Sequence, residues 1–155
     1  MADHESRVRE FMRLAGQLIP AEPIIPTEEV CKLRATLILE EALETIDALG
    51  FTVRVRSLYN DCTILKDVVD CIPHGDPPDL IEIADGCADT IVVSTGTLIS
   101  CGVPLEPLLE LIDASNLAKM GNGHSIRSDG KVIKPANWKA PDISGLLRSL
   151  GCNVP

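Results

Sequence analysis

Hydrophobic residues recur at helical spacing in four segments of the chain, and these segments define the predicted architecture. The pattern predicts amphipathic helices over residues 3–18, 28–49, 78–101 and 105–120. Thr27 has the position of an N-cap before the second of them, and Gly121 follows the fourth, where a helix C-terminus favours glycine. Beyond the fourth helix, residues 121–155 indicate a short β-hairpin followed by an extended, proline-rich tail. We therefore expect an all-α helical bundle with a hairpin and a tail at its C-terminal end.

The segment between the second and third predicted helices has no single pattern. Residues 51–56 fit either a strand or more helix, residues 61–71 are weakly helical, and residues 73–79, with the sequence PHGDPPD, indicate a loop. A chain of 155 residues has the length of one domain that can bury its own core. The expectation is a single domain over residues 1–155.

Two of the predicted helices carry acidic residues on faces that are otherwise apolar. Glu41 and Glu44 project from an apolar sector of the second helix. On the third helix, one acidic stripe is formed by Glu82, Asp85 and Asp89. A carboxylate held away from water either takes up a proton or finds a cation, and carboxylate oxygens are ligands that Mg²⁺ and Mn²⁺ prefer. Two such helices facing each other predict a divalent metal site. The alternative is that the acids line solvated faces, and Asp89 fits a surface ion pair equally well.

The chain is acidic overall, with 14 Lys and Arg against 23 Asp and Glu and a formal net charge of −9. This balance argues against a nucleic-acid polymer or an anionic membrane as a partner, because both attract a net positive surface. The N-terminus lacks the apolar segment of a signal peptide, and the longest uncharged run falls short of the roughly 20 residues of a membrane helix. We therefore expect a cytoplasmic protein. The six cysteines show no zinc-binding or redox spacing.

Basic residues concentrate near the C-terminus, between residues 119 and 139. Such a cluster of cations can bind an anionic ligand that the acidic residues of the helices would repel. The candidate substrate-binding residues are Asn116, Lys119, Arg127, Lys131, Lys134 and Trp138. Asn116 and Lys119 are three positions apart on the fourth helix, so both can contact different parts of one ligand, with Lys119 suited to an anionic group. Trp138 fits stacking on a purine or closure of a small core, and the whole segment also fits a solvated tail.

These motifs resemble the signature of a known enzyme family. Residues 40–44 match the pattern EExxE and residues 82–85 match ExxD, a combination similar to that of the MazG-like all-α nucleoside triphosphate pyrophosphohydrolases. Further similarity, to the phosphoribosyl-ATP pyrophosphohydrolase-like subgroup, comes from the segments DGxxD at 85–89, SNxxK at 115–119 and DGKVIKP at 129–135. The resemblance covers most of the chain. It departs from compact members in the longer segment between the two acidic motifs.

The resemblance implies hydrolysis of a nucleoside triphosphate to the monophosphate and pyrophosphate, by attack of water on the α-phosphorus. It implies a metal site bound by Glu41, Glu44, Glu82 and Asp85, for which we expect two or more Mg²⁺ or Mn²⁺ ions. Asp89, one turn past Asp85 on the same acidic stripe, is a further candidate ligand. Glu41 and Glu44 are the expected catalytic residues, with Glu41 taking the proton of the water. The family assembles as homodimers or homotetramers. Similarity to the MazZ-type enzymes of phages and bacteria favours GTP or dGTP as substrate, and the host cytoplasm as location if the chain is viral.

Two other functions fit the same residues. One is house-cleaning hydrolysis of nucleotides with another base, such as dUTP, dCTP or modified nucleotides, and the other is a non-catalytic helical dimerisation module. A di-iron carboxylate bundle is excluded, because no histidine follows a glutamate at the Glu-x-x-His spacing that such sites need. The chain also lacks the GxxxxGK(S/T) and GxGxxG motifs of other nucleotide-binding folds.

Overall fold

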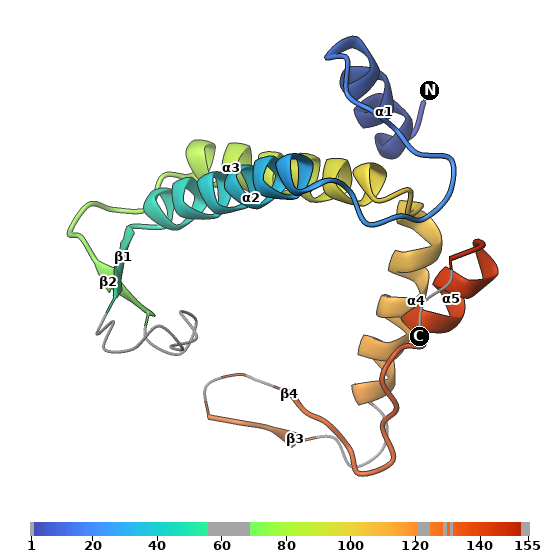
Figure 1. The fold of residues 1–155 in the computed structure, drawn as a ribbon. Coiled ribbons are helices and arrows are strands. Elements are labelled where there is room, and N and C mark those ends of the chain that lie inside the picture. Colours follow the sequence, from blue (N-terminus) through green and yellow to red (C-terminus); the bar gives the residue numbers. More distant parts are fainter. Residues whose placement is uncertain (1, 56–68, 121–124, 129, 131, 153–155) are drawn as a thin grey trace. The chain divides into compact units, whose positions relative to one another are not determined.

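The computed structural model describes residues 2–55, 69–120, 125–128, 130 and 132–152. The chain forms two compact units, which we call the central unit, residues 27–97, and the terminal unit, residues 1–26 and 98–155. Figure 1 shows the helices and strands of both. None of the described helices is by itself long and apolar enough to span a membrane, and the helices at 80–100 and 105–120 pass that test only when they are taken together.

The central unit consists of two long helices joined by a β-hairpin (Figure 1). Its elements in chain order are α2 (Glu28–Ala48), β1 (Phe51–Val55), β2 (Val69–Pro73) and α3 (Leu80–Ser100), whose last residues belong to the terminal unit. α2 begins after Thr27, whose hydroxyl accepts a hydrogen bond from the Val30 N–H at 3.4 Å. It ends before Gly50, which turns the chain with a φ of 90°.

The β1–β2 hairpin settles the ambiguous segment after α2. The two strands pair antiparallel, with Phe51 opposite Pro73 and Val55 opposite Val69, so residues 51–55 form a strand and do not extend the helix. The weak helical prediction for residues 61–71 is wrong at residues 69–71, because pairing with β1 outweighs the local preference. The rest of that predicted helix lies outside the described residues.

His74, just after the hairpin, forms hydrogen bonds with residues at the end of α2. Its Nε2 lies 3.1 Å from the carbonyl oxygen of Asp47, and its backbone N–H donates to the carbonyl oxygen of Gly50 at 3.1 Å. The Asp79 N–H donates to the carbonyl oxygen of Ala48 at 3.0 Å. These links hold the start of α3 beside the end of α2, which brings acids from both helices close together.

The terminal unit contains the first helix and the C-terminal third of the chain. Its elements are α1 (His4–Leu14), α4 (Leu105–Leu117), the 3₁₀ turn η2 (Ala118–Met120), β3 (Ser125–Ile126), β4 (Val132–Ile133) and α5 (Ile143–Ser149). Its buried hydrophobic side chains include Val8, Met12, Ile99 and Val103. The Glu5 carboxylate accepts a hydrogen bond from the Leu105 N–H at 2.9 Å. α1 thereby caps α4, whose N-cap residue, Pro104, supplies no side-chain cap.

All four predicted helices are present, with differences at their ends. α1 stops at Leu14 and not at residue 18, because Gly16 turns the chain with a φ of 70° and the Gln17 N–H bonds back to the Met12 carbonyl oxygen at 2.9 Å. α3 covers residues 80–100 and not 78–101, and the last turn of the fourth predicted helix is 3₁₀. The predicted C-terminal hairpin is confirmed, since β3 and β4 pair antiparallel.

Helix α5 contradicts the prediction of an extended tail over residues 143–149. The Asp142 side chain caps this helix by accepting a hydrogen bond from the Gly145 N–H at 2.8 Å. α5 also packs against α4, and a helix this short depends on such a partner. The pattern of the tail alone did not show this contact.

Gly102→Ala is expected to destabilise the protein by about 3 kcal/mol. Gly102 has a φ of 69°, and a Cβ there would lie 2.7 Å from the carbonyl carbon of Glu22, in a loop that the Ile24 N–H ties to Cys101 at 2.9 Å. Urea unfolding gives the change in free energy. Gly16→Ala is the matched control, with a φ of 70° but nothing within 4 Å of the added Cβ, and it should cost about 1 kcal/mol. Equal losses would exclude the Glu22 contact as the cause.

Candidate active site

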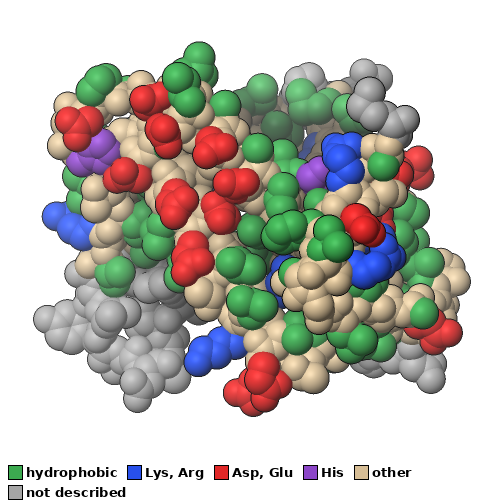
Figure 2. Space-filling view, turned by 90° about the horizontal axis from the view of Figure 1, so that it is seen from above, with side chains coloured by type: hydrophobic (Ala, Val, Ile, Leu, Met, Phe, Trp, Pro, Cys, Tyr) green, Lys and Arg blue, Asp and Glu red, His purple; other side chains and the backbone are tan. Residues whose placement is uncertain are grey.

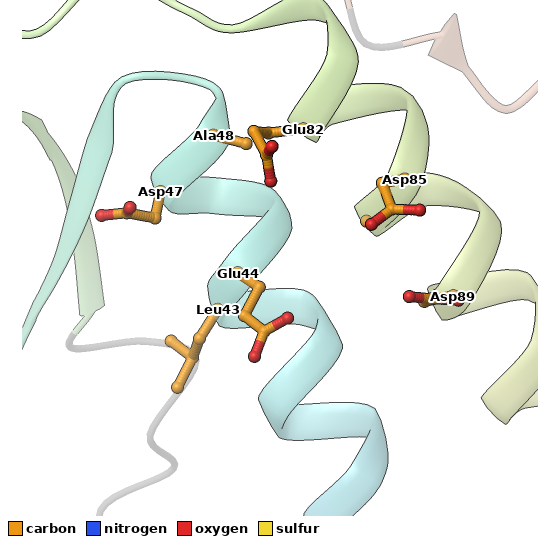
Figure 3. A pocket seen from close by; sticks show the side chains of 8 residues that line it. Leu43, Glu44, Asp47, Ala48, Glu82, Asp85 and Asp89 are labelled. Carbon is orange, nitrogen blue, oxygen red and sulfur yellow. The ribbon is translucent and has the colours of Figure 1, made fainter.

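A pocket of about 500 Å³ lies between α2 and α3 in the central unit. The residues that line it are Leu43, Glu44, Asp47, Ala48, Glu82, Asp85, Gly86 and Asp89. Figure 3 shows Glu82, Asp85 and Asp89 on α3 and Glu44 on α2, with their carboxylates in the space between the two helices. In Figure 2, acidic side chains gather on one part of the molecular face with few Lys or Arg among them. Four of the five predicted metal ligands therefore line one pocket.

Glu41 does not line the pocket but lies one turn before Glu44 on α2. Its side chain is half-buried, and its Oε2 is covered and has no hydrogen-bond partner among the described residues. Burial raises the pKa of the Glu41 carboxyl above its ordinary value of 4.5, and neighbouring negative charges raise it further. Those charges belong, in order of decreasing effect, to Asp89, Glu44, Glu40 and Asp85. Glu41 thus experiences the electrostatic field of the acids around the pocket.

The acids fit a divalent cation in charge and in donor type. Within the ranges that the structure describes, Glu44, Glu82, Asp85 and Asp89 make no ion pair with Lys or Arg. Together with the covered Glu41 oxygen, they form an uncompensated set of oxygen donors of the type that suits Mg²⁺ or Mn²⁺. No three His, Cys, Asp or Glu in the described part of the chain converge closely enough to hold an ion. The two helices therefore bring the carboxylates to one pocket. To coordinate a single ion, the carboxylate side chains would have to rotate toward a common point.

Gly86 sets how closely α2 and α3 approach at the pocket. A Cβ at Gly86 would lie 2.6 Å from Thr45 Oγ1 and 3.2 Å from Thr45 Cα. The Thr45 hydroxyl donates to the carbonyl oxygen of Glu41 at 2.7 Å and lies 3.5 Å from Thr90 Oγ1. The missing side chain of Gly86 is therefore what permits the spacing between the acids of α2 and those of α3.

Asp47 lines the pocket, although sequence reasoning did not select it. It stands three positions after Glu44, just as Glu44 stands three positions after Glu41. This repeated spacing along α2 was the signal that could have identified Asp47. Figure 3 shows its carboxylate turned away from α3. Its Oδ1 lies 3.8 Å from His74 Nε2, which gives Asp47 a place at the edge of the acidic group.

The predicted substrate-binding residues belong to the terminal unit, and the structure brings four of them together. Lys119 Nζ donates to Asn116 Oδ1 at 2.6 Å and lies 5.3 Å from the centre of the Trp138 indole. Lys134 Nζ lies 4.1 Å from the same indole. The other two are Arg127, which is exposed, and Lys131, which lies outside the described residues.

The helix-rich fold is of the all-α MazG-like type. Residues 8–116 match the model of the phosphoribosyl-ATP pyrophosphohydrolase family, a range that includes α2, α3 and nearly all of α4. The chain belongs to this family, within the MazG-like superfamily, and is thus a pyrophosphohydrolase of nucleotide-like substrates. The predicted family and fold class are confirmed. A comparison with curated proteins found no match.

Proposed function

We propose that the protein is a metal-dependent nucleoside triphosphate pyrophosphohydrolase that releases a nucleoside monophosphate and pyrophosphate, with GTP or dGTP as the favoured substrate. The observation that carries this proposal is a group of pocket acids, Glu44, Glu82, Asp85 and Asp89, that make no ion pair with Lys or Arg among the described residues. Such a group opposes binding of an anionic triphosphate unless cations intervene, so the pocket suits a substrate that arrives with Mg²⁺ or Mn²⁺.

Glu41, Glu44, Glu82 and Asp85 would hold two or more ions, and Asp89 extends the same stripe by one turn. When bound, the ions supply charge neutralisation of the triphosphate and a lowered pKa of water. In the metal-free protein the pKa of the Glu41 carboxyl is raised, and its Oε2 has no hydrogen-bond partner among the described residues, so this oxygen has an unused capacity to accept a proton or a hydrogen bond. In the proposed step Glu41 takes the proton of the attacking water, whose oxygen bonds to the α-phosphorus. The bond to the α,β-bridging oxygen breaks, and pyrophosphate leaves.

Exposed apolar side chains on α2 and α3 support assembly as a homodimer or homotetramer. The exposed fractions of Leu39, Leu80, Ile81 and Ile91 are 57%, 79%, 78% and 56%. Monomeric proteins rarely leave large contiguous apolar patches in water, and closed symmetric oligomers are the usual way to bury them. We place this assembly and its reaction in the cytoplasm, or in the host cytoplasm for a viral chain, where free nucleotides are its substrates.

A panel of ribo- and deoxynucleoside triphosphates, extended with phosphoribosyl-ATP, tests the reaction. The purified protein is incubated with each compound and Mg²⁺ or Mn²⁺, and the products are separated by ion-exchange chromatography. We expect monophosphate and pyrophosphate in equal amounts, the fastest turnover with GTP or dGTP, and loss of turnover with EDTA. Diphosphate plus orthophosphate, or no turnover with either metal, would contradict the proposal. Faster turnover of dUTP or dCTP would overturn only the base preference.

A further inference from the structure

Trp138 is held in place at both its backbone and its side chain. Its indole Nε1–H donates to the carbonyl oxygen of Ser115, near the end of α4, at 2.9 Å. Its backbone N–H donates to the carbonyl oxygen of Pro135 at 3.0 Å, which closes a turn just after β4. The half-buried indole therefore links the segment after the hairpin to the end of α4.

Two ammonium groups lie over this one indole. Lys134 approaches from the segment after β4 and Lys119 from the turn η2, with Nζ atoms 4.1 and 5.3 Å from the ring centre. Both distances are within the range at which the negative face of an indole attracts a cation. Lys119 is directed further by its hydrogen bond to Asn116.

The two ammonium groups have no neutralising carboxylate among the residues that the structure describes. Among residues 105–120, 125–128, 130 and 132–152, neither Lys119 nor Lys134 forms an ion pair. The two ammonium groups over one ring repel each other. They do so in a protein whose net charge of −9 means that carboxylates are abundant as possible partners. The ring attracts each cation but leaves the hydrogen-bonding capacity of both ammonium groups largely unused, and an anion with several phosphoryl oxygens can satisfy it.

We propose that Trp138 is a positioning residue that holds Lys119 and Lys134 together as one binding site for the polyphosphate part of the substrate. The identity of the ligand rests on the proposed function, whereas the anion site itself rests on the geometry of the cluster. The ring area over which Lys134 stands is not open to a nucleobase. Trp138 therefore acts through the two lysines and does not serve as a stacking platform for a purine at that position.

The fluorescence of Trp138 reports directly on this site, because it is the only tryptophan of the chain. The full-length protein is titrated with inorganic triphosphate in EDTA at constant ionic strength, with excitation at a wavelength that tyrosine does not absorb. We expect a saturable change of emission, and a much smaller one with sulfate. Binding that calorimetry detects without any change of emission would place the anion elsewhere and overturn the proposal, as would the absence of binding.

Lys134→Ala is expected to weaken triphosphate binding about tenfold, because it removes one charge-assisted contact. Lys139→Ala is the matched control, since it removes the same charge from an exposed lysine of the same segment, whereas the cation–π pairs with the ring are those of Lys119 and Lys134. It should weaken binding less than about twofold. Equal weakening by both variants would show a diffuse charge effect and overturn the proposal.

The positioning role of Trp138 is tested by Trp138→Leu and Trp138→Phe. Leucine should raise KM for the nucleoside triphosphate about tenfold and leave kcat within about twofold, whereas phenylalanine, which keeps a ring face for the cations, should recover part of the loss. A fall in kcat at unchanged KM, or equal KM values for both variants, would overturn this role. If circular dichroism shows that the Trp138→Leu variant does not fold, the KM of Trp138→Phe and the triphosphate binding of Lys134→Ala test the proposal instead. Triphosphate binding without turnover of any nucleotide would refute the proposed function and leave the anion site standing.

Discussion

Glu82→Gln is expected to lower kcat/KM for pyrophosphate release by about a hundredfold or more, and Glu41→Gln by about 10²- to 10⁴-fold. The amide keeps the shape of each side chain but removes a negative charge and a ligand oxygen. Glu82 lines the pocket from α3, so its loss should also raise the Mg²⁺ concentration needed for half-maximal rate. Glu41 is both a proposed ligand and the carboxyl that we assign as proton acceptor, so its loss should raise the Mg²⁺ requirement and also lower kcat at saturating Mg²⁺. Steady-state rates over a series of Mg²⁺ concentrations separate the two effects.

Glu40→Gln is the control for both variants. Glu40 is exposed and adjacent to Glu41 in sequence, so its replacement removes the same charge from α2 without removing a proposed ligand. The expected change in kcat/KM is less than about threefold. If both Glu41→Gln and Glu82→Gln release pyrophosphate at the wild-type rate, the metal-site assignment is wrong even though the reaction is right.

The same Glu41→Gln variant is expected to be more stable than the wild type at neutral pH in EDTA. The folded-state pKa of Glu41 lies above its ordinary value of 4.5, so the unfolded chain loses this proton at a lower pH than the folded chain. The wild type should therefore lose stability as the pH rises from about 4.5 through the raised pKa, and the variant should lack this part of the decline. Urea unfolding at a series of pH values measures it. Identical pH profiles for the two proteins would show that the pKa of Glu41 is not raised in the metal-free folded protein.

Gly86→Ala is expected to lower kcat/KM by about 10²-fold although the substitution lies on a helix and removes no polar group. Alanine favours a helix by up to about 1 kcal/mol over glycine, yet its Cβ would lie 2.6 Å from Thr45 Oγ1 and 3.2 Å from Thr45 Cα. The helices have to separate or shift to relieve these contacts, at a cost of about 1 to 3 kcal/mol. A shift of this kind changes the distance between the acids of α2 and those of α3. Initial rates and urea unfolding measure the two effects.

A double-mutant cycle with Thr45→Ala tests whether the contact is the cause. Alanine at position 45 removes the hydroxyl that lies nearest to the added Cβ, so Gly86→Ala should cost less activity and less stability in that background. Thr45→Ala alone loses a hydrogen bond to the Glu41 carbonyl oxygen and serves as the reference. Additive effects, or an activity of Gly86→Ala equal to that of the wild type, would contradict the role of Gly86 as the residue that sets the helix spacing.

Much of the fold and most of the acidic site follow from local patterns. The helical spacing of apolar residues predicts α1 to α4 to within a few residues at each end, because amphipathicity is a property of each segment by itself. The acids stand out for the same reason, since Glu44, Glu82, Asp85 and Asp89 occupy positions on apolar helices where charge is unexpected. The family resemblance rests on these residues and is confirmed over residues 8–116.

What the local patterns missed depends on contacts between distant residues. The β1–β2 hairpin exists because residues 51–55 pair with 69–73, and α5 exists because it packs on α4. Asp47 was not selected from the sequence, because only the placement of the end of α2 beside the start of α3 brings it to the pocket. The division of the chain into a central and a terminal unit likewise came from the contacts and not from composition, while the single-domain expectation stays a prediction.

The sequence by itself therefore determined which residues carry the charge and which helices present them, because helix periodicity places every side chain on a face. Only the tertiary structure decided how close those faces come and which side chains share one space. Gly86 against Thr45 defines the width between the acids, and Trp138 gathers two lysines that are far apart in sequence. Both are packing relations between segments, and packing depends on distances in space that no periodicity along the chain contains.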